Sequence, residues 1–205
     1  MSPRPRQTSD DEIVAATMRV MMRLSPARLT LAAVARESGV VPATLIQRFG
    51  TKRNLLLATV RRAPQSVGGQ FAAGRARFKS PIKTLIEVLV ECTGLASTPE
   101  AMANGLAYLQ IDITDAEFRV IAREQSERVR QEIRKLLDEA IAAGELRQCD
   151  TKRLAGLVQS VSGGSMINWA LYRQGALAAW VRRDLKLVLA PWQLHSTRSS
   201  TDFLE

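Results

Sequence analysis

The sequence predicts an all-α protein of about nine helices, divided into a small N-terminal domain and a larger C-terminal helical domain. Apolar residues recur every three to four positions along most of the 205 residues, which is the spacing of amphipathic helices. Capping residues, glycines and prolines interrupt this pattern as they do at helix ends. No segment alternates apolar and polar residues as a half-buried strand would. We expect domains at residues 1–62 and 63–192, followed by a mobile polar tail at 193–205.

The first helix is predicted to begin at Ser9, because Ser9 and Glu12 have the spacing of a capping box. It should end near Leu24, before Pro26, because the residue preceding a proline disfavours helical geometry. Its inward face carries Ile13, Ala16, Thr17, Val20, Met21 and Leu24.

Residues 30–52 predict two short helices joined by a tight turn. Val34 and Ala35 contribute to an apolar or small face on the first helix. Gly39 should end that helix, because glycine accepts the left-handed conformation that helix ends often need. Pro42 suits the first turn of the next helix, where a missing N–H costs nothing.

The second short helix has an inner and an outer face. Leu45 and Phe49 are four residues apart and can pack against the first helix. That leaves Thr44, Gln47 and Arg48 facing away from the core. Two helices around a glycine turn, with outward polar side chains on the second, are typical of a DNA-binding helix-turn-helix.

Thr51 is predicted to cap a fourth helix, from Lys52 to about Arg62. A lysine at a helix start opposes the helix dipole, and a nearby phosphate would remove that conflict. Lys52 is therefore a candidate contact to a nucleic-acid backbone.

The segment from Glu12 to Val60 resembles the TetR (tetracycline-repressor-like) family of transcriptional regulators. Two positions depart from that family's pattern: Ile46 replaces a phosphate-binding tyrosine, and Val41 replaces a capping serine. Ile46 is expected to touch apolar base or sugar atoms, or to sit partly inside. The matching positions are Thr30, Val34-Ala35, Gly39-Val40, Thr44-Leu45, Phe49, Lys52 and Leu55-Leu56. The DNA-binding residues expected from the pattern and the resemblance are Thr30, Pro42, Ala43, Thr44, Ile46, Gln47, Arg48 and Lys52.

The positive charge of the chain is concentrated in its first part. Residues 1–62 contain 11 Lys and Arg against 4 Asp and Glu, whereas residues 63–205 contain 18 against 16. The basic excess thus coincides with the helix-turn-helix, and the phosphates of double-stranded DNA are its natural partner.

The rest of the chain predicts helix after helix. Thr114 and Glu117 have capping-box spacing and should open a long helix that Gly144 closes. Its exposed face should carry the ion pairs Glu124–Arg128, Arg134–Asp138 and Lys135–Glu139. The predicted ranges are a continuation around 71–78 after a break near Pro64, then 80–96, a helix from Thr98, 115–143, 150–173 and 176–189.

The resemblance implies that the C-terminal domain binds an effector and pairs with a second copy through its last two helices. Apolar stripes with small residues between them favour such pairing, although an intramolecular core gives the same stripes. The candidate dimer residues are Leu157, Val161, Gly164, Val181, Leu185 and Val188. The candidate effector-pocket residues are Cys92, Met102, Leu106, Tyr108, Met166 and Trp169, for each of which ordinary core packing is an equal explanation.

No combination of residues in the sequence favours an enzyme, a cofactor or a metal site. The only histidine, His195, falls in the expected tail, and there is no glycine-rich phosphate loop. Cys92 and Cys149 lack metal-ligand spacing and predict two reduced thiols. No run is long and apolar enough to span a bilayer, and the N-terminus has no apolar signal segment, so we expect a cytoplasmic protein without a membrane partner.

These observations predict a TetR-like regulator, expected to be a repressor, that binds a palindromic operator as a homodimer. A small-molecule effector in the C-terminal domain would release it. The alternative is a TetR-like DNA-binding protein with no small-molecule effector, controlled by its abundance or by a protein partner.

Overall fold

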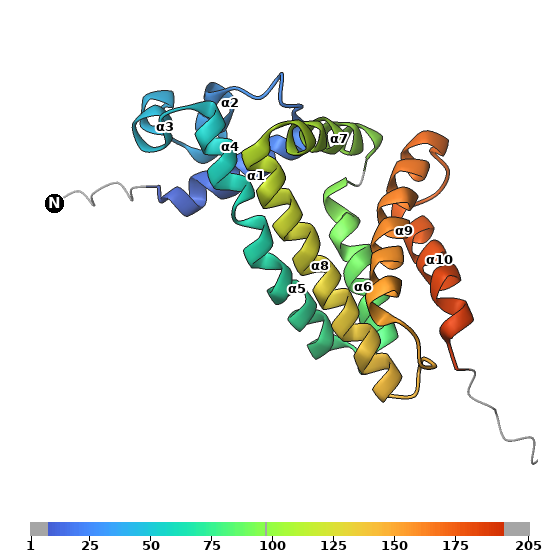
Figure 1. Ribbon diagram of the computed structural model, residues 1–205. Helices are drawn as coiled ribbons and strands as arrows, with labels where there is room; N and C mark the ends of the chain where they lie inside the picture. Colours follow the sequence, from blue (N-terminus) through green and yellow to red (C-terminus); the bar gives the residue numbers. More distant parts are fainter. Residues whose placement is uncertain (1–7, 97, 195–205) are drawn as a thin grey trace, which may run out of the picture.

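The structure, a computed structural model, describes residues 8–96 and 98–194, and it confirms the all-α class. This part of the chain holds ten α-helices and two short 3-10 helices (Figure 1). The α-helices are α1 (Asp10–Arg23), α2 (Leu31–Ser38), α3 (Pro42–Phe49), α4 (Lys52–Val60), α5 (Ala63–Arg77), α6 (Pro81–Cys92), α7 (Pro99–Thr114), α8 (Ala116–Ala142), α9 (Thr151–Tyr172) and α10 (Leu177–Leu189). The 3-10 helices are Thr93–Ala96 and Ala190–Trp192.

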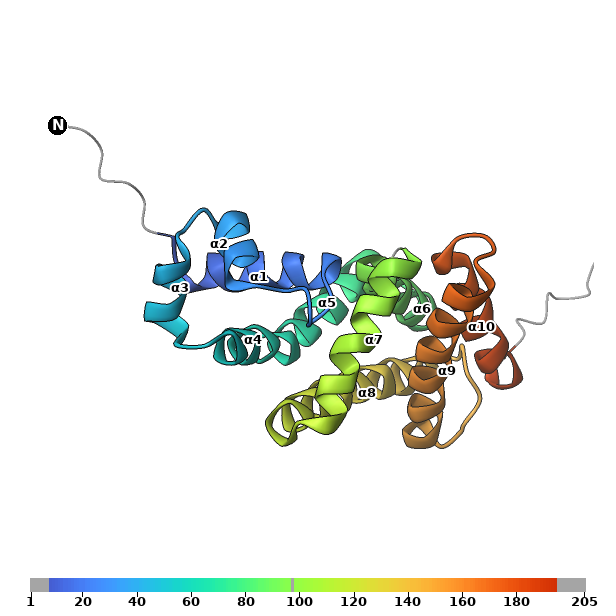
Figure 2. The same cartoon turned by 90° about the horizontal axis from the view of Figure 1, so that it is seen from above.

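The helices form an N-terminal group, α1 to α4, and a C-terminal group that includes α5, α6, α9 and α10. Helix α8 contributes to both groups. Helices α1 to α4 gather at one end, α5, α6 and α8 run along the body, and α9 and α10 lie on its outer side (Figures 1 and 2). Helix α7 crosses between α1 and the first turns of α8. Phe118 and Ile121 of α8 belong to the core of the N-terminal group, called the first core. Ile133 and Leu137 of the same helix belong to the core of the C-terminal group, called the second core. One helix therefore joins both cores.

Most predicted helix starts are confirmed. Ser9 and Glu12 form the capping box, Thr51 caps α4, and Asp150 caps α9. The break near Pro64 falls between α4 and α5, and α5 begins earlier than the continuation predicted around residues 71–78.

Two predictions on α8 were wrong. Its cap is Asp115, whose carboxylate accepts from the N–H groups of Glu117 and Phe118, while the Thr114 hydroxyl donates to the carbonyl of Gln110. The predicted pair Lys135–Glu139 is also absent, because Lys135 pairs with Glu132 and Glu139 pairs with Arg75 of α5. A long-range partner thus replaced the predicted local one only at Glu139, and the predicted pairs Glu124–Arg128 and Arg134–Asp138 are confirmed.

Gln193 and Leu194, at the start of the expected tail, contact the segment that follows α8. The N–H of Leu194 donates to the carbonyl of Glu145 at 3.0 Å, and Gln193 forms a bridge with Leu146. Residues 195–205, including His195, lie outside the described residues. Within the described ranges, no helix combines the length and apolarity that crossing a bilayer requires.

Helices α5 and α6 pack closely at Gly74. A Cβ at this position would lie 2.3 Å from Cγ2 of Val88, far inside van der Waals contact. Val88 is buried in the second core, together with Phe71 of α5 and Leu85 of α6. The absence of a side chain at Gly74 is therefore what allows the two helices to meet.

Replacing Gly74→Ala should lower the free energy of unfolding by roughly 1–3 kcal/mol, because the added methyl overpacks the α5–α6 contact. Gly69→Ala is the matched control on the same helix, since a Cβ there meets nothing within 4 Å. That variant should gain up to about 1 kcal/mol from helix propensity. Urea unfolding measures both changes. An equal gain in the two variants would show that α5 and α6 do not approach closely at Gly74.

Candidate nucleic-acid interface

The turn between α2 and α3 has the geometry that the sequence predicted. The hydroxyl of Thr30 accepts from the N–H of Ala33 at 3.1 Å and caps α2. Gly39 has φ +70°, in the left-handed region, and the N–H of Val40 then donates to the carbonyl of Ala35 at 3.0 Å. Pro42 begins α3 directly afterwards, without a side-chain cap from Val41. The helix-turn-helix is therefore confirmed as a structural unit.

Helix α3 buries one side and exposes the other. Leu45 is fully buried in the first core and Phe49 is packed against it. On the other side Pro42, Ala43 and Gln47 are exposed, and Ile46 is 53% exposed. Of the two possibilities considered for Ile46, the outward position is the one observed.

Arg48 does not point away from the core as predicted. Its side chain is 20% exposed and donates to the carbonyl of Thr8 at 2.5 Å and to the carboxylate of Asp10 at 3.2 Å. Thr44, one turn earlier on the same side, is half-buried. Arg48 therefore fixes α3 against the start of α1 in this structure.

Lys52 is also engaged within the chain. It is half-buried, and its Nζ donates to the carbonyl of Pro26 at 2.7 Å. An ammonium group carries three donors, so Lys52 can keep this bond and still contact a phosphate.

Other cations of the N-terminal group remain open to a partner. Arg28, just before α2, and Arg36 on α2 are exposed, and no carboxylate in the described ranges pairs with either. In contrast, Arg19 and Arg23 of α1 both bind Glu37 of α2, and the hydrogen bond from Arg19 is the largest cause that lowers the pKa of Glu37. The Glu37 carboxylate therefore holds α1 against α2. Arg28 and Arg36 are two cations of this surface that it does not bind.

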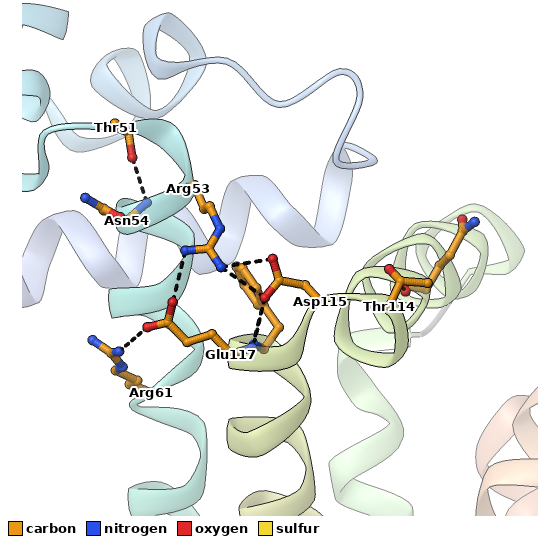
Figure 3. A network of polar contacts seen from close by, with 9 residues as sticks. Thr51, Arg53, Asn54, Arg61, Thr114, Asp115 and Glu117 are labelled. Atoms are coloured by element: carbon orange, nitrogen blue, oxygen red, sulfur yellow. Dashed lines mark hydrogen bonds and ion pairs between the residues drawn. The ribbon is translucent and has the colours of Figure 1, made fainter.

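Arg53 of α4 connects the N-terminal group to the start of α8 (Figure 3). Its guanidinium lies 2.9 Å from Oδ2 of Asp115 and 3.0 Å from Oε2 of Glu117. Glu117 also pairs with Arg61, at 2.6 Å, and the Arg53 guanidinium lies 5.6 Å from the ring centre of Phe118. The same Asp115 carboxylate thus caps α8 and holds α4. We call this cluster the α4–α8 clamp.

Tyr108, a predicted effector-pocket residue, instead joins α7 to α1. Its hydroxyl donates to the carbonyl of Leu24 at 3.0 Å, and its ring packs against the first core. Burial raises the pKa of Tyr108 to about 12. The nearby side chain of Asn104 lies 3.5 Å from the carbonyl of Met22.

The other five predicted pocket residues lie on three helices, α6, α7 and α9. Met102 and Trp169 are buried, and the indole N–H of Trp169 donates to the carbonyl of Gly175 at 3.0 Å. Cys92 and Leu106 are exposed, and Met166 is partly buried against the second core. None of them lines any of three open grooves on this molecule, one of which, about 630 Å³, lies between α6 and α10.

Two of the predicted dimer residues are core residues of a single chain. Val181 and Leu185 are 0% exposed and belong to the second core. Helix α10 does carry an apolar stripe, but these two residues face the interior of one chain and not a second copy. Leu157 on α9 is 49% exposed. Val161, Gly164 and Val188 are half-buried.

Replacing Asp115→Asn should remove a pH-dependent part of the stability while keeping a capping side chain on α8. The hydrogen bond from Arg53 is the largest cause that holds the pKa of Asp115 below its usual 3.8. A lowered folded pKa gives stability that is present above the unfolded pKa and lost as the pH falls through the folded pKa. The gap in unfolding free energy between wild type and variant should therefore be constant from about pH 7 to 5 and close below about pH 4.

The same comparison in an Arg53→Gln background is the control for this prediction. Without the guanidinium, the pH-dependent part of the gap should largely disappear. A gap with the same pH profile in both backgrounds would mean that Arg53 does not stabilise the Asp115 carboxylate.

The comparisons with known proteins agree with this geometry. Residues 13–59 match the sequence profile of "Bacterial regulatory proteins, tetR family". A comparison with curated proteins gives no match. A TetR transcription regulator from Haloarcula marismortui is similar in structure, with 17% identity, coverage of 90% of this chain and 98% of that one, and a TM-score of 0.75.

Two further structures have the same fold. SmeT, the repressor of the Stenotrophomonas maltophilia multidrug efflux pump SmeDEF, has 18% identity, covers 93% of each chain and gives a TM-score of 0.67. A transcriptional regulator from Saccharomonospora viridis, in complex with choline, has 19% identity, covers 88% of this chain and 95% of that one, and gives a TM-score of 0.72. The helix-turn-helix thus lies in the segment that matches the TetR family of regulators, and about nine-tenths of the chain has the fold of solved TetR-type regulators.

Proposed function

We propose that this protein is a repressor that binds a two-fold symmetric operator as a homodimer, with one α3 helix in the major groove of each half-site. The exposed face of α3, on the end of the molecule that carries the basic excess, is the observation that carries this proposal. In this proposal, the residues that face DNA are Thr30, Pro42, Ala43, Thr44, Ile46, Gln47 and Lys52. Arg48 serves to orient α3, because its guanidinium is bound to Thr8 and Asp10.

A second copy is proposed to cover an apolar stripe on α9. Leu157, Val161, Gly164 and Leu171 are three to seven residues apart and therefore share one helix face. Leu157 and Leu171 are exposed there, and Leu187 is exposed on the neighbouring α10. Pairing about a two-fold axis covers this surface on both copies and gives the two reading helices the symmetry of a palindromic operator.

Two modes of control follow from different observations. The choline-bound regulator of the same fold favours release by a small molecule. The mixture of buried and exposed positions among the six pocket candidates favours control by abundance or by a protein partner. In either mode the α4–α8 clamp is the polar link through which the C-terminal group holds the reading helices.

The DNA-binding proposal is tested by selecting binding sites from random duplexes and measuring affinity against salt concentration. Lys52→Ala should weaken binding to all sequences alike and lower the salt slope by roughly one, because one phosphate contact is lost. Lys152→Ala, an exposed lysine on α9, is the control and should change neither quantity. No enrichment of any sequence by the wild type would contradict the proposed function.

The dimer is tested with Gly164→Glu. A Cβ at Gly164 meets nothing within 4 Å in one chain, so the new side chain has room to begin there. In a dimer the two carboxylates would be buried close together and unpaired, at a cost of several kcal/mol. Sedimentation should show folded monomers that bind operator poorly. Gly105→Glu, at an equally open position on α7, should remain dimeric, and dimers for both variants would put the interface elsewhere.

A further inference from the structure

The outward face of α3 is almost entirely apolar. Pro42, Ala43, Ile46 and Gln47 are one, three, four or five residues apart, so they form one continuous patch opposite the buried Leu45. All four are exposed, and Val41, directly before them, is 62% exposed. Gln47 is the only member of this patch with a polar side chain.

Among the residues that the structure describes, no cation on this face can make the commonest contact to guanine. That contact is a two-pronged hydrogen bond from arginine or lysine to O6 and N7. The only charged residue of α3 is Arg48, which lies on a different side and is bound to Thr8 and Asp10. Arg28, Arg36 and Lys52 lie on other elements, where phosphates are the natural partners.

The residues that remain all match A·T base pairs. The C5 methyl group of thymine is the apolar feature of the major groove, and aliphatic side chains contact it. A glutamine can bond N6 and N7 of adenine with its amide. The patch lies in the part of the chain that carries the basic excess, which favours a polyanionic partner such as DNA.

We propose that α3 reads consecutive A·T base pairs, with Ile46 and Ala43 against thymine methyl groups and Gln47 bonded to adenine. This assignment rests on the proposed function and specifies which bases the operator must carry. Because the Ile46 side chain already stands free of the core, methyl contact requires no rearrangement of α3. Sequence preference then comes mainly from shape and apolar contact, while the flanking cations supply affinity that is the same for every sequence.

The test begins with the sequence that wild-type protein selects from random DNA. We expect A·T pairs at the positions under α3 in each half-site. In synthetic duplexes, each thymine there is then replaced by deoxyuridine, which removes the methyl group and leaves the hydrogen-bonding groups unchanged. Affinity should fall about fourfold for each contacted methyl, the factor that corresponds to about 0.8 kcal/mol for one buried carbon group.

Ile46→Ala identifies the side chain responsible. For this variant, the ratio of the affinities for the thymine and deoxyuridine duplexes should be closer to one than for wild type, at one position in each half-site. Ile113→Ala, which removes an equally exposed isoleucine on α7, should keep the wild-type ratio. Gln47→Ala should relax the preference for adenine at a different position.

Three results separate this inference from the proposed function. A selected site that wild type binds equally with thymine or deoxyuridine overturns the methyl contacts while leaving operator binding intact. A selected site with required G·C pairs under α3 overturns the A·T assignment. Failure to select any sequence overturns the proposed function itself.

Discussion

The membership of α8 in both cores is the constraint on which the rest of this structure depends. Its first turns place Phe118 and Ile121 among the side chains of α1 to α4, and its later turns place Ile133 and Leu137 in the second core. Because the interior is densely packed, neither group can rotate against the other without disturbing α8. Ion pairs from Arg53 to Asp115 and Glu117 fix the same end of the helix through polar contacts. The orientation of the reading helices is therefore set from the C-terminal group.

This arrangement explains how a change far from α3 could alter DNA binding. In the proposed dimer, pairing through α9 would fix the distance between two C-terminal groups, and α8, which contacts α4, would carry that geometry towards α3. Helix α7 adds a second connection, since Tyr108 and Asn104 contact carbonyl groups at the end of α1. An effector, a protein partner or a substitution that shifts α7 or α8 would change the spacing of the two reading helices. Any such ligand must bind the two arrangements with different affinity in order to act.

Most local signals in the sequence predicted the structure correctly, with the cap of α8 as an exception, and most of the other failures were at long-range contacts. The capping box at Ser9, the left-handed Gly39 and the cap at Asp150 follow from residues within a few positions of one another. The α4–α8 clamp joins residues 62 and 64 positions apart, and no local pattern marks such a pair.

Apolar periodicity likewise revealed which face of a helix is apolar without revealing what covers it. Val181 and Leu185 are spaced as a dimer stripe would be, yet they pack inside one chain, whereas the exposed Leu171 went unnoticed. Arg48 was predicted to point outward from its position on α3. Its guanidinium instead donates hydrogen bonds to Thr8 and Asp10, about forty residues earlier in the chain. The pocket candidates were chosen by residue type, and residue type carries no information on whether side chains converge.

The central claim, that two α3 helices read one face of a duplex from a rigid dimer, is tested most directly by a hydroxyl-radical footprint on the selected operator. The account predicts two protected patches, related by a two-fold axis and centred about one helical turn or a whole multiple of it apart. A single patch, or two patches on opposite faces of the duplex, would contradict it.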